Sequence, residues 1–249
     1  MASYPSTSCC YQGFKHEGQP TGELSRLQDF EVYTSYPPDK STEHAILILT
    51  DVTGHGTPNI QLVADQFAAN GYLVIVPDLF FGDPIPLNRP GDFDMQKWRS
   101  GGVSPRGQIP LPRDRGSHCH GELGGAQDQR IGLVGYCFGG KYVVRHLRSG
   151  KADVGYTAHP SHVDESELKE IQGPLAIAAA EDDHIFPAEK RHQSEAILRE
   201  LGLPYQVNLY SGVKHGFAVR GDPSVKQIRY AKQSAFLQAI EWFGEHLKE

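Results

Sequence analysis

Residues 130–140, Arg-Ile-Gly-Leu-Val-Gly-Tyr-Cys-Phe-Gly-Gly, join an apolar segment to Cys137, a cysteine flanked by glycines. A buried strand, a Gly-x-nucleophile-x-Gly turn and a following helix make a nucleophile elbow, in which the turn lifts the central side chain above a sheet. The backbone N–H of Phe138, at the start of the expected helix, would then face a developing oxyanion. The alternative is a tight turn that holds a buried, inert cysteine.

Apolar strand-like segments alternate with helical patterns on both sides of this elbow. The segment 45–50 is apolar at nearly every position, which is typical of a strand covered on both faces. We expect the strand at 30–36 to lie at a sheet edge, and Asp222 to cap the last helix. This alternation predicts an α/β protein with a mostly parallel sheet, and residues 1–249 are expected to form a single domain. Strands are expected at 30–36, 45–50, 72–76, 130–136, 154–158, 175–180 and 205–210, and helices at 59–70, 139–148, 187–202 and 222–247.

Composition narrows the class of protein. The 249 residues carry 24 Lys and Arg against 30 Asp and Glu, a net charge of −6, which argues against a nucleic-acid-binding protein. No run approaches the roughly 20 apolar residues that a membrane span needs, and the start has no apolar signal-peptide core. We therefore expect a cytoplasmic protein with no membrane partner, either a monomer or a homodimer. Four cysteines in this length do not suggest a disulfide framework.

The segment 101–129 breaks the alternation, because it has little apolar periodicity and many Pro, Gly and Arg residues. A long atypical loop is uncommon inside a compact domain. One hypothesis is a variant lid over the site, and the other is a gene-model artefact. Within the segment, His118, Cys119 and His120 could bind zinc, but their spacing is unlike that of most zinc sites, so no metal is expected.

A nucleophile elbow predicts an acid and then a histidine after later strands of the sheet. Strand 175–180 runs into Glu181, Asp182 and Asp183, and spacing alone leaves the choice among them open. Strand 205–210 leads to His215, which would take the thiol proton while the acid orients its ring. We expect these loops to converge, because parallel strands end at the same edge of a sheet. Ligand sites of open α/β sheets lie at that edge.

The loop after strand 45–50 holds two further candidates. The second oxyanion N–H of such enzymes lies in this loop, and Val52 is its candidate donor. Its neighbour Asp51 could interact with Cys137, or could be an ordinary solvated turn residue.

Three motifs together resemble the dienelactone hydrolase family: GYCFGG at 135–140, DDHIFP at 182–187 and HGFAVRGD at 215–222. The start of the chain, with Cys9, Cys10 and the segment 15–18, resembles fungal members of that family. The similarity covers about residues 1–98 and 130–247. It implies an α/β-hydrolase fold, a Cys-His-Asp triad without metal or organic cofactor, and a small-molecule ester or lactone substrate.

The resemblance also assigns roles to single residues. The acid of the family stands four residues before a proline, which selects Asp183. A carboxylate after the first core strand pairs with the thiol in the family, and Asp51 holds that position. In bacterial members of the family, two arginines hold the carboxylate of the substrate. Arg220 corresponds to one of them, and Gly82 occupies the position of the other. The loss of one arginine favours a bulkier or less charged ester, lactone or acyl group over a carboxylated dienelactone.

Aromatic side chains near the motifs, among them Phe217 and Tyr136, could supply apolar walls for such a substrate. Two rival functions stay open at this point. One is a catalytically impaired or carrier protein on the same fold, since fold does not determine function. The other is a related cyclase, dehydratase or acyl-releasing enzyme of fungal secondary metabolism.

Overall fold

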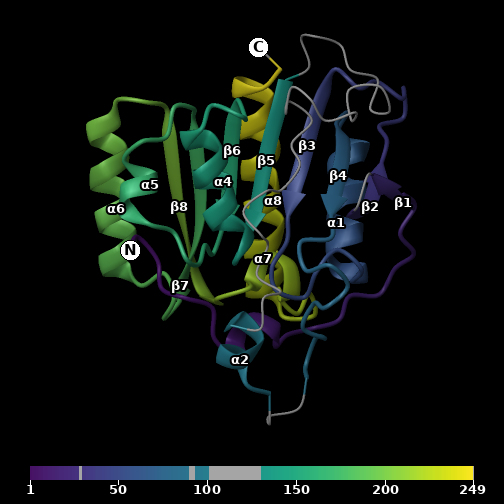
Figure 1. Ribbon diagram of the computed structural model, residues 1–249, viewed down its shortest axis with the longest axis horizontal. Coiled ribbons are helices and arrows are strands. Elements are labelled where there is room, and N and C mark those ends of the chain that lie inside the picture. Colours follow the sequence, from purple (N-terminus) through teal and green to yellow (C-terminus); the bar gives the residue numbers. More distant parts are fainter. Residues whose placement is uncertain (28–29, 90–92, 101–129, 249) are drawn as a thin grey trace.

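The computed structural model describes residues 1–27, 30–89, 93–100 and 130–248 (Figure 1). The predictions for 101–129, including those for His118, Cys119 and His120, lie outside the described residues. One sheet of eight strands runs through the described part of the chain, in the order β1-β2-β4-β3-β5-β6-β7-β8. Its strands are β1 (Glu23–Leu27), β2 (Phe30–Ser35), β3 (His44–Leu49), β4 (Leu73–Pro77), β5 (Arg130–Tyr136), β6 (Val154–Ala158), β7 (Leu175–Asp182) and β8 (Tyr205–Lys214).

The sheet is mostly parallel, as predicted. Strand β2 is antiparallel to both β1 and β4, and the pairs from β4 through β3 to β8 are all parallel. Parallel pairing brings the carboxyl ends of β3, β5, β7 and β8 to one edge of the sheet, where β3 points downward in Figure 1. The loops that carry Cys137, Asp183 and His215 therefore emerge on the same side of the molecule.

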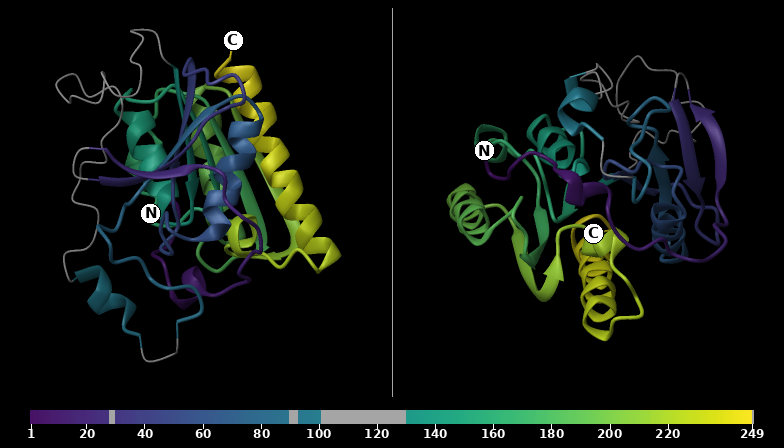
Figure 2. Two further views of the ribbon diagram at one scale, coloured as in Figure 1. Left: turned by 90° about the vertical axis from the view of Figure 1, so that its right-hand side faces the viewer. Right: turned by 90° about the horizontal axis from the view of Figure 1, so that it is seen from below.

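Helices cover both faces of the sheet, so the central strands are buried on both sides (Figure 2). In β3, Ile46 and Ile48 belong to one hydrophobic cluster, while Leu47 and Leu49 belong to the other. This alternation follows from the two-residue period of a strand, and it explains why 45–50 is apolar throughout. The helices within the described residues are η1 (Ser8–Tyr11), α1 (Pro58–Ala69), α2 (Met95–Ser100), α4 (Gly139–Arg148), α5 (Glu165–Leu168), α6 (Ala188–Leu201), α7 (Phe217–Arg220) and α8 (Lys226–His246).

Two local predictions were wrong. The strand at 30–36 was expected at the edge of the sheet, but β1 pairs with it and is the edge strand. Because the side chains of β1 are mostly exposed, that strand has no apolar pattern from which it could be predicted. Asp222 was expected to cap the last helix, but α8 begins at Lys226. The Asp222 carboxylate instead accepts a hydrogen bond from the Ser224 N–H at 2.8 Å, which closes an Asx turn before the helix.

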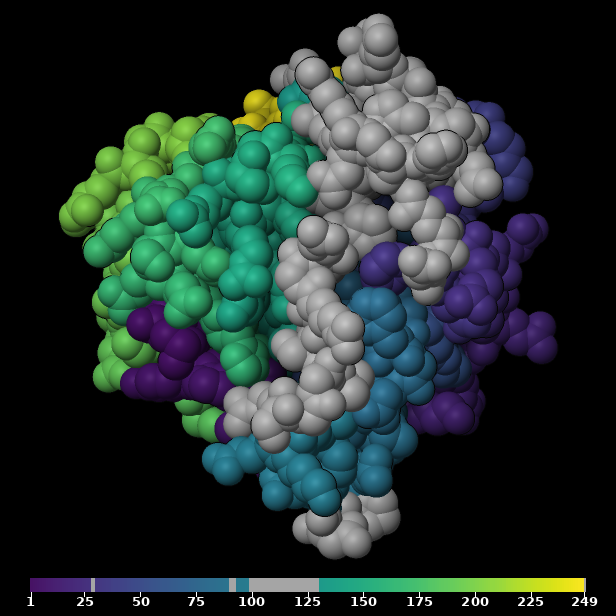
Figure 3. All heavy atoms as spheres, viewed as in Figure 1, coloured from purple at the N-terminus to yellow at the C-terminus, as the bar shows by residue number. Residues whose placement is uncertain are grey.

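The amino-terminal segment, residues 1–14, crosses the carboxyl ends of the parallel strands and runs along the lower edge in Figure 1. Its backbone is fixed to distant loops: the Ala2 N–H donates to the Val163 carbonyl at 2.7 Å, and the Phe14 N–H donates to the Arg220 carbonyl at 2.9 Å. Figure 3 shows the purple residues of this segment as part of the molecular surface beside the green residues that follow β6. The segment thus forms part of the candidate site.

Among the helices in the described ranges, none has both the length and the apolar character needed to cross a membrane.

Candidate active site

The turn between β5 and α4 has the geometry of a nucleophile elbow. Cys137 sits at its apex with φ of +50°, a conformation that a residue with a side chain adopts only when its surroundings impose it. A Cβ atom on Gly139 would lie 1.9 Å from the Leu49 carbonyl oxygen, and one on Gly135 would lie 2.6 Å from Val143 Cγ2. Both flanking glycines are therefore required by close approach of the neighbouring strand and helix.

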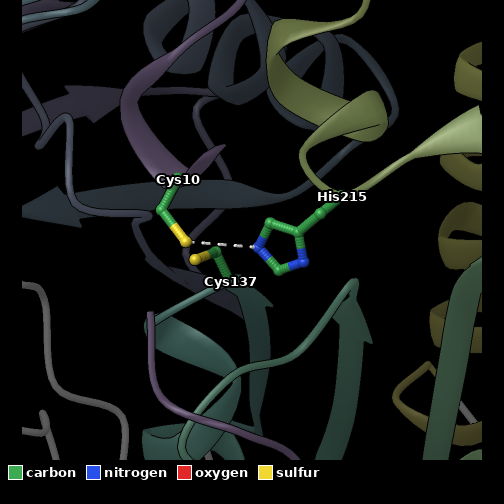
Figure 4. Close-up of side chains that lie close together, drawn as sticks. All are labelled: Cys10, Cys137 and His215. Atoms are coloured by element: carbon green, nitrogen blue, oxygen red, sulfur yellow. Dashed lines mark hydrogen bonds between the residues drawn. The ribbon is translucent and has the colours of Figure 1, made fainter. Parts of the chain in front are cut away.

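The structure brings Cys137, His215 and Asp183 together although they lie on three separate loops. The Cys137 sulfur and a ring nitrogen of His215 lie within 4.8 Å of one another (Figure 4). The other ring nitrogen, His215 Nδ1, lies 3.0 Å and 2.9 Å from the two carboxylate oxygens of Asp183. All of these side chains are buried. The carboxylate can thus hold the imidazole with Nε2 directed toward the sulfur.

Asp183 is itself held by the backbone. Its Oδ1 accepts hydrogen bonds from the N–H groups of Ile185 and Phe186, at 2.9 Å and 3.0 Å. By contrast, the neighbouring Asp182 side chain is 73% exposed and lies 3.9 Å from Lys214. The carboxylate of Glu181 accepts from the Gly212 N–H on the exposed surface. Of the three acids that sequence spacing left open, Asp183 contacts the histidine.

The amino-terminal segment and the loop after β6 add residues that sequence reasoning did not place in the site. Cys10 Sγ lies 3.6 Å from His215 Nε2, and Cys10 is fully buried. Ser6 Oγ lies 3.8 Å from the Cys137 sulfur, and Ser161 Oγ lies 3.6 Å from it. The adjacent cysteines at 9 and 10 were the available signal, but the sequence alone gives no spatial partner for either.

The electrostatics of the buried cluster favour a Cys137 thiolate beside a His215 imidazolium over two neutral side chains. Burial disfavours the Cys137 thiolate, but a hydrogen bond from Cys10 and the charge of His215 outweigh it and hold the pKa of Cys137 well below its ordinary value. Burial likewise disfavours the imidazolium, but the charges of Cys137 and Asp183 raise the pKa of His215 to about 10. Burial raises the pKa of Cys10 well above its ordinary value, so Cys10 stays a thiol and can act as a donor.

Asp51 and Arg220, which the sequence assigned to the thiol and to the substrate respectively, are bonded to each other. Arg220 Nη1 donates to Asp51 Oδ2, and the two side chains are 1% and 2% exposed. The other Asp51 oxygen accepts from the Thr53 N–H at 2.9 Å. Arg220 Nε donates to the Gln12 carbonyl at 3.1 Å, and its Nη2 donates to the Cys9 carbonyl at 3.3 Å. The pair therefore anchors the amino-terminal segment over the site.

The two expected oxyanion donors lie at the amino end of α4 and in the loop after β3. Phe138 directly follows Cys137 and stands at the amino end of α4. Val52 is fully buried in the loop after β3, and its carbonyl accepts from the Ile85 N–H at 2.8 Å. A helix amino end and a loop fixed in this way can both present N–H groups toward an anion.

Aromatic rings line the Cys137 side of the sheet. The ring of Phe80 lies 5.5 Å from that of Phe138 and also 5.5 Å from that of Trp98, measured between centroids. Phe217, expected in the substrate site, belongs to the other hydrophobic cluster; its ring lies 5.7 Å from that of His159, which in turn lies 4.9 Å from the His215 ring. Tyr136, also expected in the substrate site, belongs to the other hydrophobic cluster and lines a cavity of about 440 Å³ with residues of α1 and α8.

Known proteins share the sequence and the fold of this chain. Residues 30–247 match the sequence profile of the Dienelactone hydrolase family. The chain is 65% identical to Hydrolase tropI of Talaromyces stipitatus and 49% identical to Hydrolase pyvD of Aspergillus violaceofuscus, in both cases over the full length of both chains. The crystal structure of a putative dienelactone hydrolase from Klebsiella pneumoniae matches with a TM-score of 0.68 at 16% identity, covering 87% of this chain and 93% of that one. The chain is therefore a hydrolase of the α/β-hydrolase fold and belongs to the dienelactone hydrolase family.

Proposed function

We propose that this hydrolase cleaves an ester or lactone by covalent catalysis, with Cys137 as nucleophile, His215 as the proton-transfer group and Asp183 as the residue that orients it. The observation that supports the proposal most directly is the chain of contacts from Asp183 through His215 to the Cys137 sulfur. A nucleophile next to a base that is in turn held by an acid is the arrangement that covalent acyl transfer requires.

In the proposed reaction, the Cys137 thiolate attacks the carbonyl carbon and a tetrahedral oxyanion forms. The N–H groups of Phe138 and Val52 stabilise that oxyanion. The His215 imidazolium then protonates the departing alkoxide, which leaves a thioacyl enzyme. His215, now neutral, accepts a proton from water; the resulting hydroxide equivalent attacks the thioester, and the carboxylic acid product departs with regeneration of the thiolate and imidazolium.

The surroundings of Cys137 favour a substrate without a carboxylate close to the scissile bond. Arg220 already pairs with Asp51 and donates to two backbone carbonyls, so its guanidinium has little capacity left for a substrate anion. The rings of Phe80, Phe138 and Trp98 offer apolar contact instead. We therefore propose an uncharged aromatic or other apolar acyl group as the substrate class.

The proposal is tested with activated aryl esters and intact-protein mass spectrometry. We expect Cys137→Ala to abolish turnover. We also expect rapid quenching of the wild-type enzyme to reveal an added acyl mass that maps to the peptide containing Cys137. Unchanged turnover in Cys137→Ala, or an acyl group on another residue, would remove Cys137 from the mechanism.

A matched pair of variants tests the acid. Asp183→Asn removes the carboxylate that contacts His215, and we expect kcat to fall by about 10³- to 10⁴-fold, as when the acid of a triad is neutralised. Asp182→Asn makes the same chemical change one residue away, on an exposed side chain, and we expect wild-type kcat. Equal losses in the two variants would contradict the assignment.

A further inference from the structure

The sulfur atoms of Cys10 and Cys137 and a ring nitrogen of His215 converge in one buried cluster (Figure 4). All of these ligand atoms lie within 4.8 Å of one another. Hydrolysis as proposed above forms its covalent intermediate on one thiol and transfers protons through one imidazole, so the second thiol takes no part in bond making or proton transfer. From this juxtaposition we propose that the three side chains form an inhibitory binding site for a thiophilic divalent cation of the zinc class.

The spacing of the ligand atoms fits zinc. With Zn–S bonds of about 2.3 Å, Zn–N bonds of about 2.0–2.1 Å and a tetrahedral angle, a sulfur and a nitrogen on one ion stand about 3.6 Å apart. The distance from Cys10 Sγ to His215 Nε2 is 3.6 Å. Two sulfurs on the same ion stand about 3.8 Å apart, within the 4.8 Å that encloses the cluster. The cluster is thus compact enough for one ion to contact all of its ligand atoms.

The groups around the ligands match those of zinc sites. Metal-binding histidines usually donate their second ring N–H to a carboxylate, which fixes the tautomer and ring orientation. His215 Nδ1 lies 2.9 Å from Asp183 Oδ2, so Nε2 is the nitrogen available to a cation. The hydroxyls of Ser6 and Ser161, 3.8 Å and 3.6 Å from the Cys137 sulfur, can donate to a metal-bound thiolate.

The charges are also compatible. Two thiolates neutralise a divalent cation, and cation binding releases the protons held by the Cys10 thiol and the His215 imidazolium. The nearby positive charge of Arg220 is offset by its buried pair with Asp51. A cavity of about 370 Å³, lined by Cys9, His215 and Arg220 among others, borders the cluster and offers a route of entry. With three protein ligands, the fourth position of the ion is open to water.

Binding has a direct consequence for the reaction. A cation on this site engages the sulfur that attacks the substrate and the nitrogen that transfers the proton. Occupancy and turnover therefore exclude each other. Cys10, on η1 of the amino-terminal segment, brings the third ligand to a pair that would otherwise hold a cation weakly.

The test uses the full chain, kept reduced, and Co²⁺ as a probe, because thiolate ligands give bound Co²⁺ an intense charge-transfer absorption. We expect the wild-type protein to show this absorption at one equivalent and to lose it when Zn²⁺ is added. Cys10→Ser should weaken Co²⁺ binding at least about ten-fold, and Asp183→Asn should weaken it by about 10- to 100-fold. Cys9→Ser, the matched change at the neighbouring position, should leave the absorption and the affinity unchanged.

The inference is overturned if reduced wild-type protein shows no saturable absorption. It is also overturned if the signal persists in Cys10→Ser but disappears in Cys9→Ser or Cys119→Ser, since the cation would then bind elsewhere. A thermal melt checks that Cys10→Ser folds, and His215→Gln tests the site from its other side. Failure of the proposed function is distinguishable: a protein that binds Co²⁺ but has no esterase activity contradicts only the hydrolysis mechanism.

Discussion

The ion pair between Asp51 and Arg220 provides the sharpest test of the structure, because both side chains are almost fully buried. Asp51→Asn preserves the shape of the side chain and removes its charge, so the guanidinium stays buried without its anion. Loss of one partner of a buried ion pair typically costs about 3–5 kcal/mol of the free energy of unfolding. Because Arg220 keeps its bonds to the Gln12 and Cys9 carbonyls, we expect the lower end, about 3 kcal/mol.

That cost can be expressed as a melting temperature. For a chain of 249 residues, 1 kcal/mol corresponds to about 2–4 °C, so Asp51→Asn should lower Tm by about 6–12 °C in differential scanning calorimetry. Asp182→Asn is the matched control, since its side chain and that of Lys214 are 73% and 83% exposed. Such exposed pairs contribute little, and we expect a change of no more than about 2 °C.

A double-mutant cycle isolates the pair from its surroundings. Removal of both charges, in Asp51→Asn with Arg220→Met, should cost less than the sum of the two single changes, because neither charge is then left buried alone. The single variant Arg220→Met and the double variant should also make residues 1–14 more sensitive to limited proteolysis. Arg220 donates hydrogen bonds to the carbonyls of Cys9 and Gln12, and both variants lose them. Equal Tm values for Asp51→Asn and Asp182→Asn, or a strictly additive cycle, would refute the argument.

Two further outcomes follow from the site. Because the pKa of Cys137 lies well below its ordinary value, its thiolate persists as the pH falls, and its alkylation by iodoacetamide should change little between pH 9 and pH 7, whereas an ordinary thiol slows more than about ten-fold. The alkylation of Cys137 must be followed by peptide mass spectrometry, because the pKa of Cys9 is also lowered, to about 6. His215→Ala should restore a steep pH dependence of alkylation at Cys137. A steep pH dependence in the wild-type enzyme would contradict the assignment of Cys137 as a thiolate. Gly139→Ala should prevent folding or lower Tm severely, because its Cβ would meet a β3 carbonyl oxygen at 1.9 Å. Gly244→Ala, in open space on α8, should instead raise stability by about 0.5–1 kcal/mol, and equal melts for the two variants would contradict the packing of the elbow.

Local sequence determined the elements that carry the chemistry. The apolar run before Cys137 and the glycines around it are typical of a strand, a tight turn and a helix within eleven residues, so this local pattern suffices to predict the elbow. The alternation of strands and helices likewise predicts a parallel sheet. Since parallel strands end at one edge, the order of nucleophile, acid and histidine could be predicted from the chain alone.

Tertiary structure decided which side chains meet at that edge. Asp51 and Arg220 are 169 positions apart and Cys10 and His215 are 205 apart, and no local preference links either pair. The resemblance to the dienelactone hydrolase family assigned Asp51 to the thiol and Arg220 to the substrate. Their mutual contact depends on how the β3 loop, α7 and the amino-terminal segment pack.

The same distinction holds for Tyr136 and Cys10. Tyr136 adjoins Cys137 in the chain, yet successive residues of a strand point to opposite faces, and the sharp turn directs only the cysteine into the site. Cys10 is distant in the chain, yet residues 1–14 cross the carboxyl ends of the strands and bring its sulfur to the histidine. Apolar periodicity and turn-forming residues act over a few positions, so they can be recognised in the sequence. Contacts between loops depend on the path of the whole chain, which only the folded structure provides.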